Sequence, residues 1–120
     1  MTVHNGEKHL SEAIDGILNQ TFKDFEFLVI DDGSTDGSAD IIQSYKDVRI
    51  RFISNGKNLS VPVSLNMGLN LARGEYIARM DCDDISLPQR LEKQVQFMDA
   101  NPEVGVCGTW LETFGRIKEI

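Results

Sequence analysis

The chain has 120 residues, of which 41% are hydrophobic and 26% charged, a composition typical of one ordinary globular domain. Its 12 Lys and Arg against 19 Asp and Glu give a formal net charge of −7, which argues against nucleic acid or an anionic membrane surface as a partner. No apolar run approaches the roughly 20 residues of a membrane span, and Cys82 and Cys107 are too isolated for a disulfide framework or a zinc site. We therefore expect a single domain over residues 1–120, in a reducing, cytoplasmic compartment.

Short β-rich apolar runs alternate along the chain with stretches of helical periodicity. After a short strand piece at Met1–His4, the predicted strands are Glu26–Ile30, Arg49–Ile53, Glu75–Met80 and Val104–Gly108. These four begin 23, 26 and 29 residues apart, which leaves room for a crossover helix and is too far for hairpins. The alternation predicts an α/β fold with a mostly parallel sheet and helices on both faces.

Four helices are predicted between the strands, each with one apolar stripe. The last should begin at a capping box formed by Ser86 and Gln89, with Pro88 in its first turn. Thr109–Ile120 would begin a further element. The stripes, in chain order, are Leu10, Ala13, Ile14, Ile17 and Leu18; Ile41, Ile42 and Tyr45; Val61, Leu65, Gly68, Leu69 and Ala72; and Leu91, Val95 and Met98.

Two acidic clusters directly follow predicted strands. One is Asp31-Asp32-Gly33-Ser34-Thr35-Asp36-Gly37, and the other is Asp81-Cys82-Asp83-Asp84. The carboxyl ends of parallel strands share one edge of a sheet, and ligands of open α/β sheets bind beyond that edge. Thr2 to Asn5 and Asn55 follow two other predicted strands, so they should reach the same edge.

Carboxylates crowded at one edge repel each other unless a cation or hydrogen-bond donors compensate them. Mg²⁺ or Mn²⁺ binds through one or two carboxylates together with substrate phosphates, and the Asp-x-Asp turn allows Asp81 and Asp83 to point into one cleft. The chain has no G-x-x-x-x-G-K-[ST] or G-x-G-x-x-G loop, so the phosphates would come with the ligand. The pattern favours a nucleoside diphosphate derivative held by a metal ion. The plain alternative is that both clusters are only turns and helix starts.

Six ordered blocks of sequence run through nearly the whole chain. They are Asn5-Gly6-Glu7, Ile17-Leu18-Asn19-Gln20-Thr21-Phe22, Val29-Ile30-Asp31-Asp32-Gly33-Ser34-Thr35-Asp36, Gly74-Glu75-Tyr76-Ile77-Ala78, Asp81-Cys82-Asp83-Asp84 and Pro88-Gln89-Arg90-Leu91. In these blocks the sequence resembles the family 2 glycosyltransferases. The resemblance implies a Rossmann-like GT-A fold, the amino-terminal nucleotide-sugar-binding portion of a glycosyltransferase domain, and a role in polysaccharide biosynthesis.

The resemblance also implies a set of site residues. Asp32 would hydrogen-bond the base, while Thr2 and His4 would line the nucleobase and ribose pocket. Asp83 would ligate Mn²⁺ or Mg²⁺ under the diphosphate, and Asp81 would touch the ribose or a metal-bound water. The nucleotide-binding set is Thr2, His4, Asn5, Asp31, Asp32 and Asp81, and the metal set is Asp83 and Asp81. The donor would be a nucleotide sugar, with UDP as its expected nucleotide. The acceptor would be a saccharide or lipid-linked saccharide, used by an enzyme peripheral to the inner face of a membrane.

The sequence departs from the family pattern at two places. Thr2-Val3-His4-Asn5 stands where the family usually has Pro-x-Tyr-Asn, and Leu65 stands where many members have an Arg that meets the pyrophosphate. In this family the general base and the acceptor-binding elements follow the Asp-x-Asp motif, and the sequence continues for 37 residues beyond Asp83. We therefore expect these 120 residues to bind the donor without transferring its sugar at a normal rate.

Two other kinds of protein compete with this interpretation. A phosphorelay receiver domain is also about 120 residues long, doubly wound and acidic around Mg²⁺, but its Asp pair follows its first strand and a Lys lies on its closing strand. A non-catalytic nucleotide-binding or assembly module is the second alternative. Its incomplete sheet edge at the amino terminus would pair with another copy to form a homo-oligomer.

Overall fold

The computed structural model describes residues 1–113 of the chain. The described part contains three strands and four helices, in the order β1 (Thr2–Val3), α1 (Glu7–Leu18), β2 (Phe27–Asp31), α2 (Ser38–Ser44), β3 (Ile50–Ser54), α3 (Val61–Leu71) and α4 (Arg90–Ala100). Each of the four predicted helices is present, and the first three follow a strand as expected for crossover connections.

The sheet is parallel throughout, in the order β1-β2-β3. Thr2 pairs with Ile30 on one side of β2, and Phe27 pairs with Ile50 on the other. The predicted strands at 26–30 and 49–53 are both found, each displaced by one residue toward the carboxyl end. The prediction of a mostly parallel sheet is confirmed.

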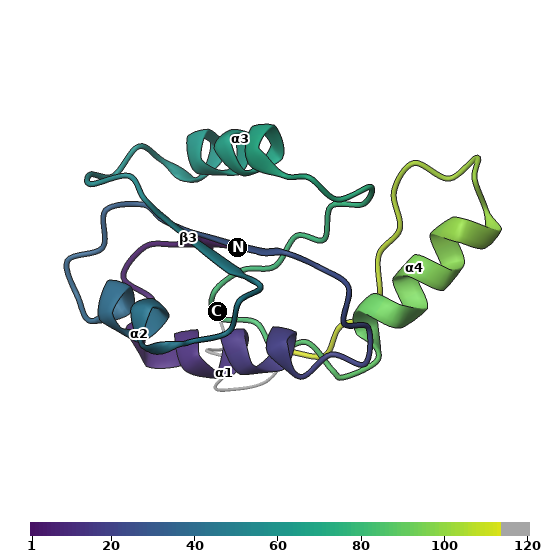
Figure 1. The fold of residues 1–120 in the computed structure, drawn as a ribbon, viewed down its shortest axis with the longest axis horizontal. Coiled ribbons are helices and arrows are strands. Elements are labelled where there is room, and N and C mark those ends of the chain that lie inside the picture. Colours follow the sequence, from purple (N-terminus) through teal and green to yellow (C-terminus); the bar gives the residue numbers. More distant parts are fainter. Residues whose placement is uncertain (114–120) are drawn as a thin grey trace, which may run out of the picture.

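Helices cover both faces of the sheet (Figure 1), with α1 and α2 on one face and α3 on the other. Alternate residues of β2 face opposite ways, as the period of a strand requires. Phe27 and Val29 belong to the buried core together with Leu10 and Ile14 of α1. On the other face, the side chain of Ile30 lies 3.3 Å from the position that a Cβ on Gly68 would occupy, so this glycine lets α3 approach the sheet closely.

Two predicted strands are wrong. Residues 104–108 form no strand in the described part of the chain, and residues 75–80 form none before a single parallel bridge that joins Asp81 to Thr2. Both segments have β-type composition, but a strand also needs a neighbouring backbone with which to exchange hydrogen bonds. Among residues 1–113 the segment at 104–108 has no paired strand, and the side chain of Val106 is 88% exposed.

The apolar stripes of the last two helices are less buried than predicted. In α3, Val61 and Leu69 are exposed, and the one fully buried residue is Ser64. In α4 only Leu91 is fully buried. The predicted capping box is also wrong, because α4 begins at Arg90 with no side-chain cap.

The amino-terminal edge of the sheet offers little backbone for pairing with another copy. β1 has only two residues, and its outer side already carries the bridge from Thr2 to Asp81. The start of Thr109–Ile120 forms no helix or strand over residues 109–113, and the rest of this predicted element lies outside the described residues.

Candidate functional site

The carboxyl ends of the three strands meet at one edge, as predicted. The Asp32 amide donates to the Val3 carbonyl at 2.7 Å, and the Asn55 amide donates to the Asp31 carbonyl at 2.9 Å. The residues that follow β1, β2 and β3 are therefore neighbours in space. The bridge to Thr2 brings Asp81 to the same edge.

The carboxylate of Asp32 is buried, with 1% of the residue exposed, and it organises the loop before α3. One of its oxygens accepts hydrogen bonds from Asn55 Nδ2 and the Leu59 amide, both at 2.8 Å, and the other accepts from the Ser60 amide at 3.0 Å. Burial by itself would raise the pKa of Asp32, but the hydrogen bonds, that of Leu59 foremost, outweigh burial and leave this pKa lowered.

His4 lies at this edge of the sheet, and the hydrogen-bond partners of its two ring nitrogens fix its tautomer. Its Nδ1 lies 2.9 Å from the Asp32 carbonyl oxygen, which can only accept, so Nδ1 carries a hydrogen. Its Nε2 lies 3.2 Å from Asn58 Nδ2, which is an amide donor, so Nε2 accepts. These two contacts fix the orientation of the imidazole, while the residue itself is exposed.

Asn5 and Asp31 serve mainly to shape the loop after β2. Asn5 Oδ1 accepts from the Thr35 amide at 2.8 Å, and the Asn5 amide donates to Ser34 Oγ at 3.0 Å. Asp31, which is 3% exposed, accepts from the Ser34 amide at 3.3 Å. Asn5 also has a φ of 51°, a left-handed conformation that Asn tolerates better than most residues. Their hydrogen bonds to Ser34 and Thr35 therefore stabilise the loop of the first acidic cluster.

A second set of polar contacts joins the starts of α1 and α2. Glu7 Oε2 accepts from the Gly37 amide at 2.7 Å, and the two oxygens of Asp36 accept from the Glu7 and Ser38 amides at 3.2 and 3.0 Å. Burial would raise the pKa of Asp36, but these hydrogen bonds outweigh it and lower that pKa. Asp36 is therefore part of the scaffold.

A pocket of about 330 Å³ opens between these loops and the Asp-x-Asp turn. Asp81 and Asp83 line it together, at the same edge of the sheet as His4 and Asp32. Its lining residues are Thr2, Val3, His4, Asp32, Val61, Arg79, Asp81, Cys82 and Asp83. Four of the six residues in the predicted nucleotide set, and both residues in the metal set, are thus brought together.

Arg79 belongs to this pocket although sequence reasoning did not single it out. Its Nη2 lies 3.3 Å from Asp81 Oδ1, and both side chains are largely exposed. The signal was available, because a charged residue at the end of the apolar run Tyr76-Ile77-Ala78 has no place in a buried strand.

The segment that follows the acidic turn is held by Gln20, which comes shortly after α1. Gln20, which is completely buried, donates through Nε2 to the Leu87 carbonyl at 2.7 Å and to the Gly16 carbonyl at 3.0 Å. Its Oε1 accepts from the Leu91 amide at 2.9 Å. Gln20 therefore joins the end of α1 to the segment between the acidic turn and α4.

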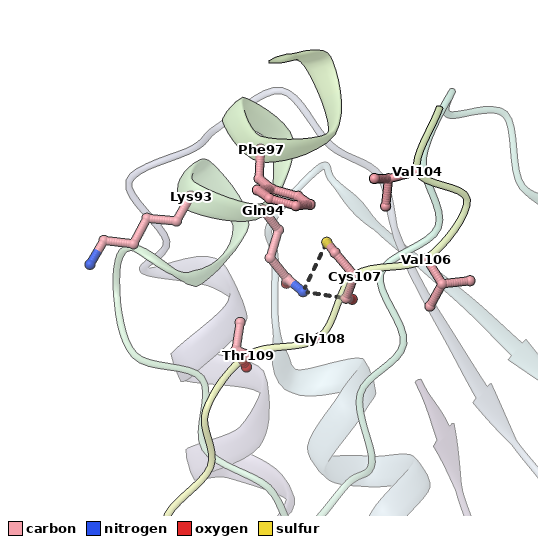
Figure 2. Close-up of a pocket in the computed structure, with 8 residues that line it drawn as sticks. All are labelled: Lys93, Gln94, Phe97, Val104, Val106, Cys107, Gly108 and Thr109. Carbon is pink, nitrogen blue, oxygen red and sulfur yellow. Dashed lines mark hydrogen bonds between the residues drawn. The ribbon is translucent and has the colours of Figure 1, made fainter. Parts of the chain in front are cut away.

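A second pocket, of about 390 Å³, lies beside α4 and is shown in Figure 2. Phe97, Val104 and Val106 give it apolar walls, and Gln94 extends from α4 to donate to the Cys107 carbonyl at 3.4 Å. It is larger than the first pocket, but its lining contains no carboxylate. The chemistry of a phosphorylated, metal-dependent ligand therefore favours the smaller pocket.

Within residues 1–113, no three His, Cys, Asp or Glu side chains are grouped to hold a metal ion by themselves. The acidic pair fits a different kind of site, in which Mg²⁺ or Mn²⁺ takes one or two protein carboxylates and completes its shell with phosphate and water. Among the same residues, no helix is long and apolar enough to cross a membrane.

Comparison with known proteins places this geometry in a family. The model of the family described as "Glycosyl transferase family 2" matches residues 1–120. An uncharacterized glycosyltransferase of Methanocaldococcus jannaschii is 45% identical over 113 residues, which cover 92% of this chain and 39% of that protein. The chain thus spans about two fifths of the length of this relative.

Two solved structures share the fold. A fragment of S. aureus TarS in complex with UDP-GlcNAc matches with a TM-score of 0.76 and 27% identity, over 84% of this chain and 30% of that one. A mannosyltransferase from Pyrobaculum calidifontis in complex with GDP-Man and Mn²⁺ matches with a TM-score of 0.77 and 26% identity, over 87% of this chain and 32% of that one. The family match decides against a phosphorelay receiver domain. The chain belongs to glycosyltransferase family 2 and has the GT-A fold.

Proposed function

We propose that this chain is the donor-binding part of a glycosyltransferase, and that it binds a nucleotide sugar in the pocket that contains His4, Asp81 and Asp83. The observation that supports this proposal most is that the pocket brings together the oriented ring of His4 and the carboxylates of Asp81 and Asp83 at the carboxyl edge of a parallel sheet. The TarS and mannosyltransferase structures, which contain UDP-GlcNAc and GDP-Man, support a nucleotide-sugar ligand.

Asp83 and Asp81 are the residues that would hold a divalent ion. The ion, when bound, supplies positive charge next to the diphosphate and so stabilises it as a leaving group. Asp81 and Asp83 both line the pocket, and neither is buried, so their oxygens remain available to a ligand. The mannosyltransferase complex with Mn²⁺ supports Mn²⁺ or Mg²⁺ at this place.

The nucleoside would lie against Thr2 and His4. The imidazole of His4 presents a flat face that can stack on a base, and its contacts to the Asp32 carbonyl and Asn58 fix the plane of the ring. Asp32 would position the loop at 58–60 through its hydrogen bonds from the Leu59 and Ser60 amides, and so shape the wall against which the base lies. Asn5 and Asp31 would support this wall of the pocket through the loop after β2.

Transfer would proceed to a hydroxyl of a saccharide or lipid-linked saccharide, in the assembly of a polysaccharide. This step needs a base to deprotonate the acceptor hydroxyl. We assign no base among the residues of the pocket, and we propose donor binding without efficient transfer as the property of these 120 residues.

Isothermal titration calorimetry of the 120-residue chain tests this proposal. We expect UDP, UDP-GlcNAc or GDP-mannose to bind in the presence of Mn²⁺ and to bind at least about tenfold more weakly in its absence, because two carboxylates otherwise face the diphosphate. Asp83→Asn should abolish the effect of Mn²⁺. Asp84→Asn is the matched control, since it removes one charge from the same turn at a residue outside the pocket lining.

If Asp83→Asn and Asp84→Asn weakened Mn²⁺-dependent binding equally, the assignment of the metal to Asp83 would be wrong. If none of the three nucleotides bound to the wild-type chain with Mn²⁺, the proposed function itself would be wrong.

A further inference from the structure

Arg79 is the one cationic side chain among the nine residues that line the acidic pocket. The pocket also contains the carboxyl groups of Asp32, Asp81 and Asp83. The Asp32 carboxylate already accepts hydrogen bonds from Asn55, Leu59 and Ser60. The free negative charge of the pocket therefore comes from the acidic turn, and Arg79 is its local counter-ion.

The contact between Arg79 and Asp81 is easily exchanged. A single nitrogen of the guanidinium meets a single carboxylate oxygen at 3.3 Å, and the two side chains are 63% and 52% exposed. An exposed pair of this kind contributes little to stability. Two-point binding, the strong mode of an Arg with an oxyanion, is not used by Asp81.

The backbone of Arg79, in contrast, is anchored. Its carbonyl accepts a hydrogen bond from Arg90 Nη2 at 2.8 Å, and Arg90 also donates to Ser86 Oγ at 2.9 Å. The next residue, Met80, is part of the buried core. The base of the side chain is thus fixed at the pocket wall while its guanidinium remains exposed and most of its donors stay free of Asp81.

We propose that Arg79 binds the phosphate oxygens of the ligand, and that Asp81 holds Arg79 in the pocket until Asp81 coordinates a divalent ion. When Asp81 turns to the ion, the guanidinium loses its partner and can offer two parallel N–H groups to the diphosphate. Arg79 and the ion would then neutralise the ligand from two sides. This inference rests on the proposed function, because it takes the ligand to be a nucleoside diphosphate derivative.

Titration of UDP and of uridine separates a phosphate contact from a general effect on the pocket. With saturating Mn²⁺, Arg79→Gln should weaken UDP about tenfold or more, the loss expected for a charge-assisted hydrogen-bond pair, and should change uridine affinity by less than about twofold. Arg79→Lys, which keeps the charge but not the fork, should restore part of the loss. Arg73→Gln is the matched control, because Arg73 is exposed and pairs with Glu26 away from the pocket.

Titration of Mn²⁺ alone tests the exchange between the two partners of Asp81. Because the guanidinium competes with the ion for this carboxylate, ligand-free Arg79→Gln should bind Mn²⁺ more tightly than the wild-type chain and more tightly than Arg73→Gln. Unchanged Mn²⁺ affinity would overturn the role given to Asp81.

One outcome of these titrations would overturn the role of Arg79 alone, and another would overturn the proposed function. If Arg79→Gln left the ratio of UDP to uridine affinity unchanged, Arg79 would make no phosphate contact, while nucleotide binding by the wild type would still stand. If the wild-type chain bound neither UDP nor uridine, the proposed function would fail, and the role of Arg79 would fail with it.

Discussion

Asp32 shows what the sequence conveys about a single residue of the site and what it does not. Its place directly after a buried strand predicts correctly that it reaches the carboxyl edge of the sheet. Its buried contacts with Asn55, Leu59 and Ser60 come from residues 23 to 28 positions further along the chain. A pattern of neighbouring residues cannot reveal such partners. Only the structure shows that Asp32 is hydrogen-bonded within the protein, whereas Asp81 and Asp83 are exposed.

Gly33 and Gly56 provide a matched pair for testing how tightly the loop after β2 packs against the loop before α3. Both have positive φ, of 72° and 70°. A Cβ on Gly33 would collide with the Lys57 carbonyl carbon, whereas a Cβ on Gly56 would meet nothing within 4 Å.

We expect Gly56→Ala to lower the free energy of unfolding by about 1 to 2 kcal/mol, the cost of placing a side chain in the left-handed region. Gly33→Ala should lower it by clearly more, because backbone must also move. Urea denaturation of the two variants measures both values, and equal losses would show that the loops are not in close contact.

At the scale of elements, prediction succeeded where a segment has a strand or a core to pack against. Residues 27–30 form a continuous apolar run within the central strand of the sheet, while the predicted stripe of α1 packs into the core. The segments at 75–80 and 104–108 have similar composition and are not strands. Composition measures the preference of a residue for a strand, whereas strand formation depends on a partner whose position is a property of the whole fold.

Gln20 should stabilise the junction between α1 and α4 well beyond its single position. Gln20→Leu removes the donor to the Leu87 carbonyl and the acceptor of the Leu91 amide, and it puts an apolar side chain of comparable size in their place. We expect a loss of about 2 kcal/mol in the free energy of unfolding, because buried polar groups lose their partners.

Hydrogen exchange gives a sharper measure of the same change. In Gln20→Leu, amides of α4 should lose protection more than those of β2, since the junction and not the sheet is broken. Gln96→Leu, at an exposed position of α4, serves as the control. Uniform loss of protection in Gln20→Leu would contradict a local role.

Glu26 links β2, β3 and the end of α3, and it should make stability depend on pH. Its hydrogen bond from Arg51, at 2.8 Å, and that from the Arg73 amide, at 2.7 Å, lower the pKa of Glu26 from 4.5 to about 2. A group with a lowered pKa in the folded state stabilises the fold above its unfolded value and loses that contribution as pH falls toward the folded value.

The unfolding free energy should therefore fall between about pH 4.5 and pH 2, and it should fall less steeply in Glu26→Gln than in the wild type. Urea denaturation at several pH values in this window measures the two slopes. Identical slopes would show that Glu26 does not contribute to the acid sensitivity of the fold.

At the scale of the whole molecule, the net charge of −7 is concentrated at one edge. Six of the 19 acidic residues belong to the two clusters, namely Asp31, Asp32, Asp36, Asp81, Asp83 and Asp84. The first three accept hydrogen bonds from neighbouring loops, so the structure itself compensates them. The last three are exposed. A cation from solution would therefore compensate more negative charge at the acidic turn than at the first acidic cluster.

Paramagnetic line broadening measures directly where a metal-bound nucleotide lies on the molecule. In an NMR spectrum of the ¹⁵N-labelled chain, UDP with a small amount of Mn²⁺ should selectively broaden the amide signals of His4, Asp81, Cys82 and Asp83, and Mn²⁺ with Asp83→Asn should not. Broadening centred on Gln94 and Cys107 in the pocket beside α4, or no selective broadening at all, would contradict the proposed site.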